Sequence, residues 1–417
     1  MVSPTGPLCR AAGVRRADVT GGLLLVDPLL VRAHGLNATA AVIWDALDGE
    51  PPSEAVVDRV ATVYGLDPAS VRDGVVGTIE RFVDEGLVTP NGGSGSPRTA
   101  PTQIPGQFPN VPSTDEVVPD GHADLPWVPP VGPFRGLDVT FDLITTDAEI
   151  GRYLAAVWAP LAIAGAPAPP ERVRRYTISD CDTGPGLLLA LDGRVVARVG
   201  SGSAAAALAV WHANQLISTE TTRLLQVHAS AVTIDGATVV LPAVMNSGKS
   251  TLATALVAAG AGYLTDEAVA IDPGTGLVLP YPKAITLDPG SWTLFPDLEP
   301  PLVRDLPGLH HAKWYVHPDA IRAGAVASAA APSALVFPVY DPERPTSLAP
   351  VTPVDAAAEL ARHCFNLPAM GQVGVDLIAQ LASTIPCAAL SVHDLDSGVA
   401  AVRRAARAAA DPAAVDR

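Results

Sequence analysis

The sequence predicts an α/β protein in which a P-loop domain follows a small α+β module of winged-helix type. Two observations predict this fold. A Val-rich strand runs directly into Asn246-Ser247-Gly248-Lys249-Ser250-Thr251 and then into a helix, which is the order that a phosphate-binding loop requires. Near the N-terminus, strand-like segments precede three helix-like ones. The expected parts are residues 1–89, a linker at 90–133 and a second domain at 134–417.

Composition excludes several classes of protein. The 417 residues suffice for two or three domains, and Asp and Glu outnumber Lys and Arg by 43 to 27. That balance argues against nucleic-acid partners and anionic membrane surfaces, which need concentrated basic charge. The four cysteines are scattered, without metal-ligand spacing. We therefore expect a cytoplasmic protein with reduced thiols and without nucleic-acid or membrane partners, and the sequence leaves homo-oligomerisation open.

The N-terminal module begins with strands at 23–27 and 29–36. Helices follow at 39–49, 53–64 and 68–85. Asn37 or Thr39 is expected to cap the first helix, and Gly65 ends the second. The third helix carries an apolar stripe, made of Val71, Val75, Ile79, Phe82 and Val83.

The linker separates this module from the rest of the chain. Of its 44 residues, 17 are Pro or Gly. Such a segment forms neither a helix interior nor a central strand, so we expect a semi-extended tether with a reach of about 35–40 Å.

Beyond the linker, hydrophobic patterning and turn residues define the remaining elements. Strands are expected at 137–143, 187–199 (a hairpin turning at Asp192-Gly193), 227–234, 237–244, 261–264, 333–341 and 387–395, and helices at 148–163, 204–216, 249–259 and 400–410.

The loop that opens the 249–259 helix carries the phosphate-binding chemistry. In a P-loop, the loop amides and the helix N-terminus face the phosphates, so we expect Lys249 to reach the β- and γ-phosphates and Ser250 to bind Mg²⁺. Ala243 replaces the usual first glycine, which is tolerable at negative φ and costly at positive φ. ATP and Mg²⁺ are the expected cofactors, and the alternative is a chance GKST in a structural turn.

Two adjacent acids follow the next strand, seventeen residues after Lys249. Beside a P-loop, Asp266 and Glu267 are placed to hold Mg²⁺ and to accept a proton from an attacking hydroxyl. The alternative is an ordinary solvated strand exit. His228, on the strand before the loop, either approaches this site or is a core residue.

Residues 228–272 resemble the catalytic core of HPr kinases and HPr-kinase-related proteins. The shared features are His-Ala-Ser-Ala, SGKST, and Gly-X-Leu-X-Asp followed by a second acid. The resemblance implies that Asp266 serves the metal, Glu267 activates a serine hydroxyl and His228 supports both, although the acids' roles could be exchanged.

The segment after the acids departs from the bifunctional HPr enzymes. It reads LPYPKAITLDPGSW, where those enzymes have a Gly-rich segment linked to dephosphorylation. This departure argues against carrying over phosphorylase activity and HPr as substrate. Lys283 is either a transition-state cation or a solvated surface charge. For His310, His311 and Lys313, a polar loop is the expected account.

The N-terminal module resembles the PqqD family of precursor-recognition elements. LLVRAHGLNATAAVIWDALDG and VRDGVVGTIERFVDEGLV carry the match. The resemblance implies that a leader peptide adds a strand to the sheet edge, in a groove between 31–36 and a face of 71–83. The alternative is that these apolar residues form only the module's own core.

Together, the parts predict an ATP-dependent kinase that phosphorylates a Ser or Thr hydroxyl of a ribosomal precursor peptide captured through its leader. One alternative is a kinase for a small molecule or a carrier protein. Another is a non-catalytic, ATP-gated precursor chaperone. The Asp266-Glu267 pair favours chemistry, because a pure switch needs no base.

Overall fold

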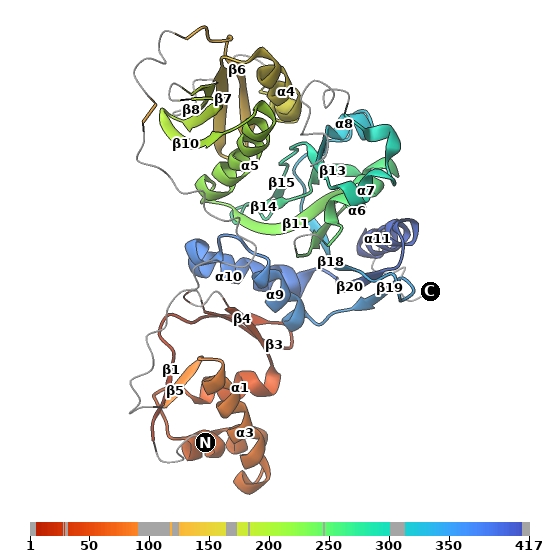
Figure 1. Ribbon diagram of the computed structural model, residues 1–417. Helices are drawn as coiled ribbons and strands as arrows, with labels where there is room; N and C mark the ends of the chain where they lie inside the picture. The colour runs from red at the N-terminus through yellow and green to blue at the C-terminus, as the bar shows by residue number, and fades with distance from the viewer. Residues whose placement is uncertain are drawn as a thin grey trace. The chain divides into compact units, whose positions relative to one another are not determined.

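The chain forms two compact units, one made of residues 1–105 and 350–387, the other of residues 106–349 and 388–417 (Figure 1). The computed structural model describes residues 6–27, 29, 32–90, 117–118, 125–163, 173–181, 184–244, 247–300 and 313–410. Most of the predicted 90–133 linker lies outside the described residues. Among the described helices, none is long and apolar enough to cross a membrane.

The first unit contains the predicted strand-then-helix module. Its antiparallel sheet has the order β2-β3-β4, and a short pair, β1 and β5, joins the two ends of the module. The elements are β1 (Leu8–Arg10), β2 (Arg15–Val19), β3 (Gly22–Asp27), β4 (Arg32–Asn37), α1 (Ala38–Ala46), α2 (Ser53–Tyr64), α3 (Pro68–Asp84) and β5 (Val88–Pro90). The predicted order of elements, with strands followed by three helices as in a winged-helix type of module, is confirmed.

Local sequence explains where these helices begin and end. Asn37 caps α1, since its side chain accepts a hydrogen bond from the Ala40 amide at 2.9 Å. Gly65 ends α2 with a left-handed φ of 65°. The three helices and one face of the sheet share a core that includes Leu25, Trp44 and Ile79. Much of the α3 stripe is therefore the module's own core.

Two helices from the C-terminal part of the chain pack against the same sheet. They are α9 (Pro353–Arg362) and α10 (Leu367–Thr384). A Cβ atom on Gly35 would lie 2.7 Å from Val354 Cγ1, so α9 approaches the backbone of β4 directly. The expected division of the chain placed these helices in the domain at 134–417, whereas here they group with the N-terminal sheet.

The second unit begins with a five-stranded sheet of order β10-β9-β8-β7-β6. Its elements are β6 (Val131–Gly136), β7 (Val139–Thr145), α4 (Ala148–Trp158), β8 (Val173–Asp180), β9 (Leu187–Leu191), β10 (Arg194–Val199) and α5 (Gly202–Glu220). Phe141, Trp158 and Tyr176 pack against one another in its core. Because β6 starts at Val131, the end of the predicted linker belongs to this sheet.

The larger sheet of the second unit carries the P-loop. Its order is β15-β14-β11-β12-β18-β20-β19, and β13 also pairs with β11. The strands are β11 (Leu225–Ile234), β12 (Ala237–Pro242), β13 (Gly262–Thr265), β14 (Ala268–Ile271), β15 (Val278–Leu279), β18 (Pro332–Tyr340), β19 (Ser347–Pro350) and β20 (Cys387–Val392).

Two helices, α6 (Lys249–Ala258) and α11 (Leu395–Ala410), pack together against this sheet. A smaller pair, β16 (Ile285–Leu287) and β17 (Trp314–Val316), contributes to a second cluster beside α6, near α7 (Pro289–Trp292) and α8 (Pro318–Ile321). The loop between β12 and α6 thus lies at one end of a buried strand, as a P-loop requires.

Candidate functional site

The loop between β12 and α6 has the backbone of a phosphate cradle. Gly248 precedes the helix with a φ of 84°, a conformation that favours glycine. Ala243 is not among the non-glycine residues with positive φ. The methyl group at the usual glycine position is therefore tolerated, and the departure from the motif costs no backbone strain.

The P-loop lysine is buried within its own loop. Lys249 Nζ donates to the carbonyl oxygens of Ala243 at 2.9 Å and Val244 at 2.6 Å. Burial lowers the pKa of Lys249 to about 8, although the negative charges of Glu267 and Asp266 oppose the shift. Those carboxylates are therefore near enough to act on the P-loop lysine, so the structure brings three predicted site residues together.

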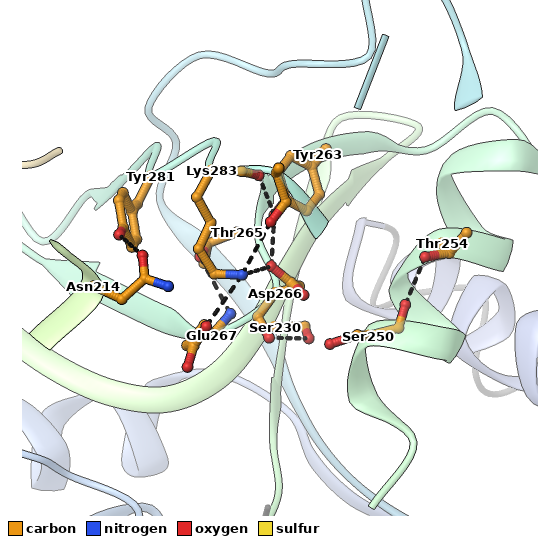
Figure 2. A network of polar contacts seen from close by, with 11 residues as sticks. Asn214, Ser230, Ser250, Thr254, Tyr263, Thr265, Asp266, Glu267, Tyr281 and Lys283 are labelled. Carbon is orange, nitrogen blue, oxygen red and sulfur yellow. Dashed lines mark hydrogen bonds and ion pairs between the residues drawn. The ribbon is translucent and has the colours of Figure 1, made fainter. Parts of the chain in front are cut away.

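The two acids occupy the turn between β13 and β14 (Figure 2). The Glu267 carbonyl accepts a hydrogen bond from the Ala229 amide on β11 at 3.2 Å, which anchors the turn to the central sheet. Lys283 Nζ lies 2.8 Å from Asp266 Oδ1 and 3.1 Å from Glu267 Oε2. Lys283 therefore holds the two carboxylates together. The alternative that Asp266 is an ordinary solvated residue at the end of a strand is wrong, because Asp266 is buried.

Lys283 is a buried cation with only 4% of its surface exposed. Burial alone would lower its pKa, but the carboxylates of Asp266 and Glu267 raise it above the ordinary 10.5. The solvated surface charge considered from the sequence is therefore wrong. Lys283 fixes the positions of both acids from the loop between β15 and β16.

Asp266 is charged despite its burial. The Tyr263 hydroxyl donates to Asp266 Oδ1 at 2.8 Å. Burial alone would raise the pKa of Asp266, but the Lys283 ammonium and the hydrogen bond from Tyr263 lower it below the ordinary 3.8. The side chain therefore offers a carboxylate at neutral pH.

The second oxygen of Asp266 fits a metal ligand. Asp266 Oδ2 is buried and makes no hydrogen bond within the described part of the chain, and Ser250 points toward this carboxylate (Figure 2). An unsatisfied buried oxygen is costly, whereas Mg²⁺ binds one or two carboxylates together with phosphate and water oxygens. Among the described residues, no cluster of three or more His, Cys, Asp or Glu side chains could hold a metal alone.

His228 is buried on β11, opposite Ala268 at the start of β14. Its carbonyl oxygen accepts a hydrogen bond from the Ala243 amide at 3.4 Å. The backbone of His228 therefore ties the start of the P-loop to the strand that follows the acids. A catalytic role for its imidazole remains a prediction.

The other predicted residues have separate places. Ser247 Oγ is buried without a hydrogen-bond partner in the described residues, and Thr251 Oγ1 lies 2.6 Å from Ser291 Oγ on α7. Lys313 pairs with Asp288 at 3.4 Å on the surface. The predicted nucleotide-binding Asn246 lies outside the described residues, as do His310 and His311.

Sequence reasoning missed the tyrosines that surround the acids. Tyr263 is fully buried and bonds to Asp266, and the Tyr281 hydroxyl donates to Asn214 Oδ1 at 2.6 Å (Figure 2). Tyr263 lies three residues before Asp266, on the strand that presents it. No local pattern marks this pair, because Tyr263, Leu264 and Thr265 are all buried on β13.

Among the described residues, the two edges of the β2-β3-β4 sheet differ. Gln372 Nε2 on α10 donates to the Arg16 carbonyl of β2 at 2.7 Å. At the opposite edge, β4 pairs only with β3 among the described strands. In the antiparallel register of β3 and β4, the backbone N–H groups of Ala33 and Gly35 point away from β3.

A contact between a histidine and a glutamate borders this edge. His34 Nδ1 on β4 lies 3.2 Å from Glu85 Oε2, just after α3. Burial is the main cause that lowers the pKa of His34, and the positive charge of Arg362 on α9 adds to it.

Comparison with known proteins identifies the first module. Residues 22–88 match the family model of coenzyme PQQ synthesis protein D (PqqD), so the chain contains a PqqD domain. Among solved structures, the Hpr(Ser) kinase/phosphatase from Coxiella burnetii is similar at 14% identity, with a TM-score of 0.22, over 43% of this chain and 95% of that chain. Comparison with curated proteins gives no match.

Proposed function

We propose that this protein is an ATP- and Mg²⁺-dependent kinase that transfers phosphate to a Ser or Thr hydroxyl of a precursor peptide bound by its PqqD domain. The observation that carries the proposal is the buried cluster of Asp266, Glu267 and Lys283 beside Lys249. A P-loop that served only as a nucleotide switch would need no second lysine holding two carboxylates.

Burial supports a division of labour between the two acids. The side chain of Asp266 is 1% exposed and that of Glu267 is 21% exposed. Glu267 is therefore the acid that an incoming hydroxyl can reach, and it orients the nucleophile and accepts its proton. Asp266 and Ser250 would hold Mg²⁺, which when bound neutralises charge on the phosphates.

The two lysines have different tasks in this proposal. Lys249 exchanges its two loop carbonyls for phosphate oxygens when nucleotide binds. Lys283 stays with the acids as a positioning residue, because both of its carboxylate partners lie within 3.1 Å.

The PqqD domain supports a peptide substrate. An extended peptide can pair with an open strand edge, where main-chain hydrogen bonds give affinity and side-chain pockets give register. The β4 edge has backbone N–H groups that point away from β3, so they are placed to pair with a peptide strand. A leader bound there would raise the local concentration of the acceptor hydroxyl at the kinase site.

Glu267→Gln tests the proposed chemistry. The variant and wild type are incubated with Mg·ATP and a candidate precursor peptide encoded beside this chain, and the added phosphate is followed by mass spectrometry. Because glutamine cannot accept the proton, we expect phosphorylation to fall by about a hundredfold or more, with ATP affinity unchanged.

The exposed Glu343→Gln is the matched control and is expected to behave as wild type. Full activity in Glu267→Gln would contradict the role of Glu267. Wild-type protein that binds ATP and peptide without transferring phosphate would contradict the kinase and favour a chaperone.

A further inference from the structure

A pocket of about 370 Å³ opens beside the P-loop, on the second unit alone. Its walls come from the start of α6, from α7 and the residues just after it, from the end of β18, and from the segment that joins β20 to α11. Ser247, Gly248 and Lys249 form part of this wall. The cavity is therefore continuous with the phosphate cradle.

Two large apolar side chains stand unusually exposed in this pocket. Tyr340, at the end of β18, is 61% exposed, and Leu294, just after α7, is 52% exposed. Pro338, Val392 and Leu395 extend the apolar wall. Exposed apolar surface gathered at one concave site indicates a ligand that covers it.

Three polar side chains of the wall, Thr251, Ser291 and Asp394, are already engaged in hydrogen bonds, whereas Ser247 and His393 also line the pocket. Thr251 Oγ1 and Ser291 Oγ lie 2.6 Å apart. Asp394 accepts hydrogen bonds from the Ser397 amide at 2.9 Å and from the Ser397 hydroxyl at 2.8 Å, at the start of α11. The pocket therefore offers flat apolar contact more than a dense set of polar contacts.

The pocket contacts the P-loop but not the acid cluster. Its lining includes the P-loop but none of Asp266, Glu267 and Lys283. A ligand whose phosphates lie on Lys249 can thus occupy the pocket without contacting the acid cluster.

We propose that this pocket binds the base and ribose of a nucleoside triphosphate, with the base stacked on Tyr340 and against Leu294. The inference rests on the proposed function, because it assigns the base end of the same nucleotide. Stacking on an aromatic side chain suits any flat base and gains affinity by covering both faces.

The test compares ATP with inorganic triphosphate, which carries the phosphates without a base. Titration calorimetry on the full chain with Mg²⁺ measures both affinities. In Tyr340→Ala we expect ATP affinity to fall about tenfold and triphosphate affinity to stay unchanged, while Tyr340→Phe keeps both.

Val339→Ala is the matched control, because Val339 is 62% exposed but does not line the pocket. The inference is overturned if Tyr340→Ala leaves ATP affinity unchanged, if it weakens both ligands equally, or if wild type binds ATP no tighter than triphosphate. Wild-type protein that binds neither ligand would instead overturn the proposed function itself.

Discussion

Two buried lysines lie close to the same pair of acids, and their surroundings move their pKa values in opposite directions. Lys249 donates to neutral carbonyls, so burial dominates and lowers its pKa to about 8. Lys283 touches two carboxylates, so their charge dominates and raises its pKa. At neutral pH both lysines are protonated, but of the two only Lys249 has a pKa within the pH range of ordinary buffers.

This difference predicts a pH dependence of nucleotide binding. Phosphate favours protonated Lys249, so ATP affinity should fall as pH rises through about 8. Binding at pH 8 should take up protons, which calorimetry in buffers of different ionisation enthalpy measures directly. Lys249→Met should bind ATP weakly and remove the uptake. Constant affinity from pH 7 to 9 would contradict the lowered pKa.

The sequence predicts the part of the site that lies in contiguous motifs. Lys249, Ser250, Asp266 and Glu267 were predicted because the loop and the strand exit are short-range patterns, and the structure brings them together. The partner of the acids, Lys283, could not be assigned, since its burial depends on strands that are distant in sequence. The local sequence around Lys283 does not distinguish a buried lysine from an exposed one.

At the scale of elements, the two edges of the β2-β3-β4 sheet differ. Gln372 caps the Arg16 carbonyl at the β2 edge, and the β4 edge stays open among the described strands. An open edge is a template for pairing with another chain. In the proposed function, the PqqD domain would therefore pair with an extended peptide along the β4 edge.

Ala33→Pro tests peptide pairing at this edge. Proline removes the outward amide of Ala33, and edge strands tolerate proline where the N–H faces outward. We expect the affinity for a precursor peptide to fall about tenfold, as measured by fluorescence anisotropy, with ATP affinity unchanged. Ala33→Ser keeps the amide and should bind as wild type does. Wild-type peptide affinity in Ala33→Pro would place the peptide elsewhere.

The elements predicted from sequence include the strands and helices with clear periodicity or caps, such as α2 and the β11-β12 hairpin. The two helices α9 and α10 were not predicted. Thr352-Pro353 was an available start signal, because Thr352 caps α9 and proline is favoured in the first turn. Their place against β2 and β4 was beyond sequence reasoning, because the contacting residues lie more than 300 positions apart.

For the whole molecule, the chain passes between the two units three times. Two of these passages are short: β19 ends at Pro350 and α9 begins at Pro353, and α10 ends at Thr384 and β20 begins at Cys387. The 90–133 segment is therefore one of three connections between the units, so its reach alone would not set the effective concentration of a peptide bound by the first unit.

The first unit should also unfold as one cooperative body. Val354 is 7% exposed between α9 and the sheet, so Val354→Asp buries a carboxylate and should destabilise the unit by about 3 kcal/mol. Hydrogen exchange should then show β2–β4 and α9–α10 losing protection together. Val373→Asp, at a position 55% exposed on α10, is the matched control. Loss of protection in the helices alone would show that they are separate.

The helices α9 and α10 also bear on how such a protein could be redirected to another peptide. The first unit is discontinuous in the gene, with its sheet encoded at one end and two helices that pack on it encoded some 260 codons after the PqqD match ends at residue 88. A chimaera that exchanged only the N-terminal segment would join a foreign sheet to helices shaped for Gly22 and Gly35. An exchange of the first unit would therefore have to include both the N-terminal sheet and the helices α9 and α10.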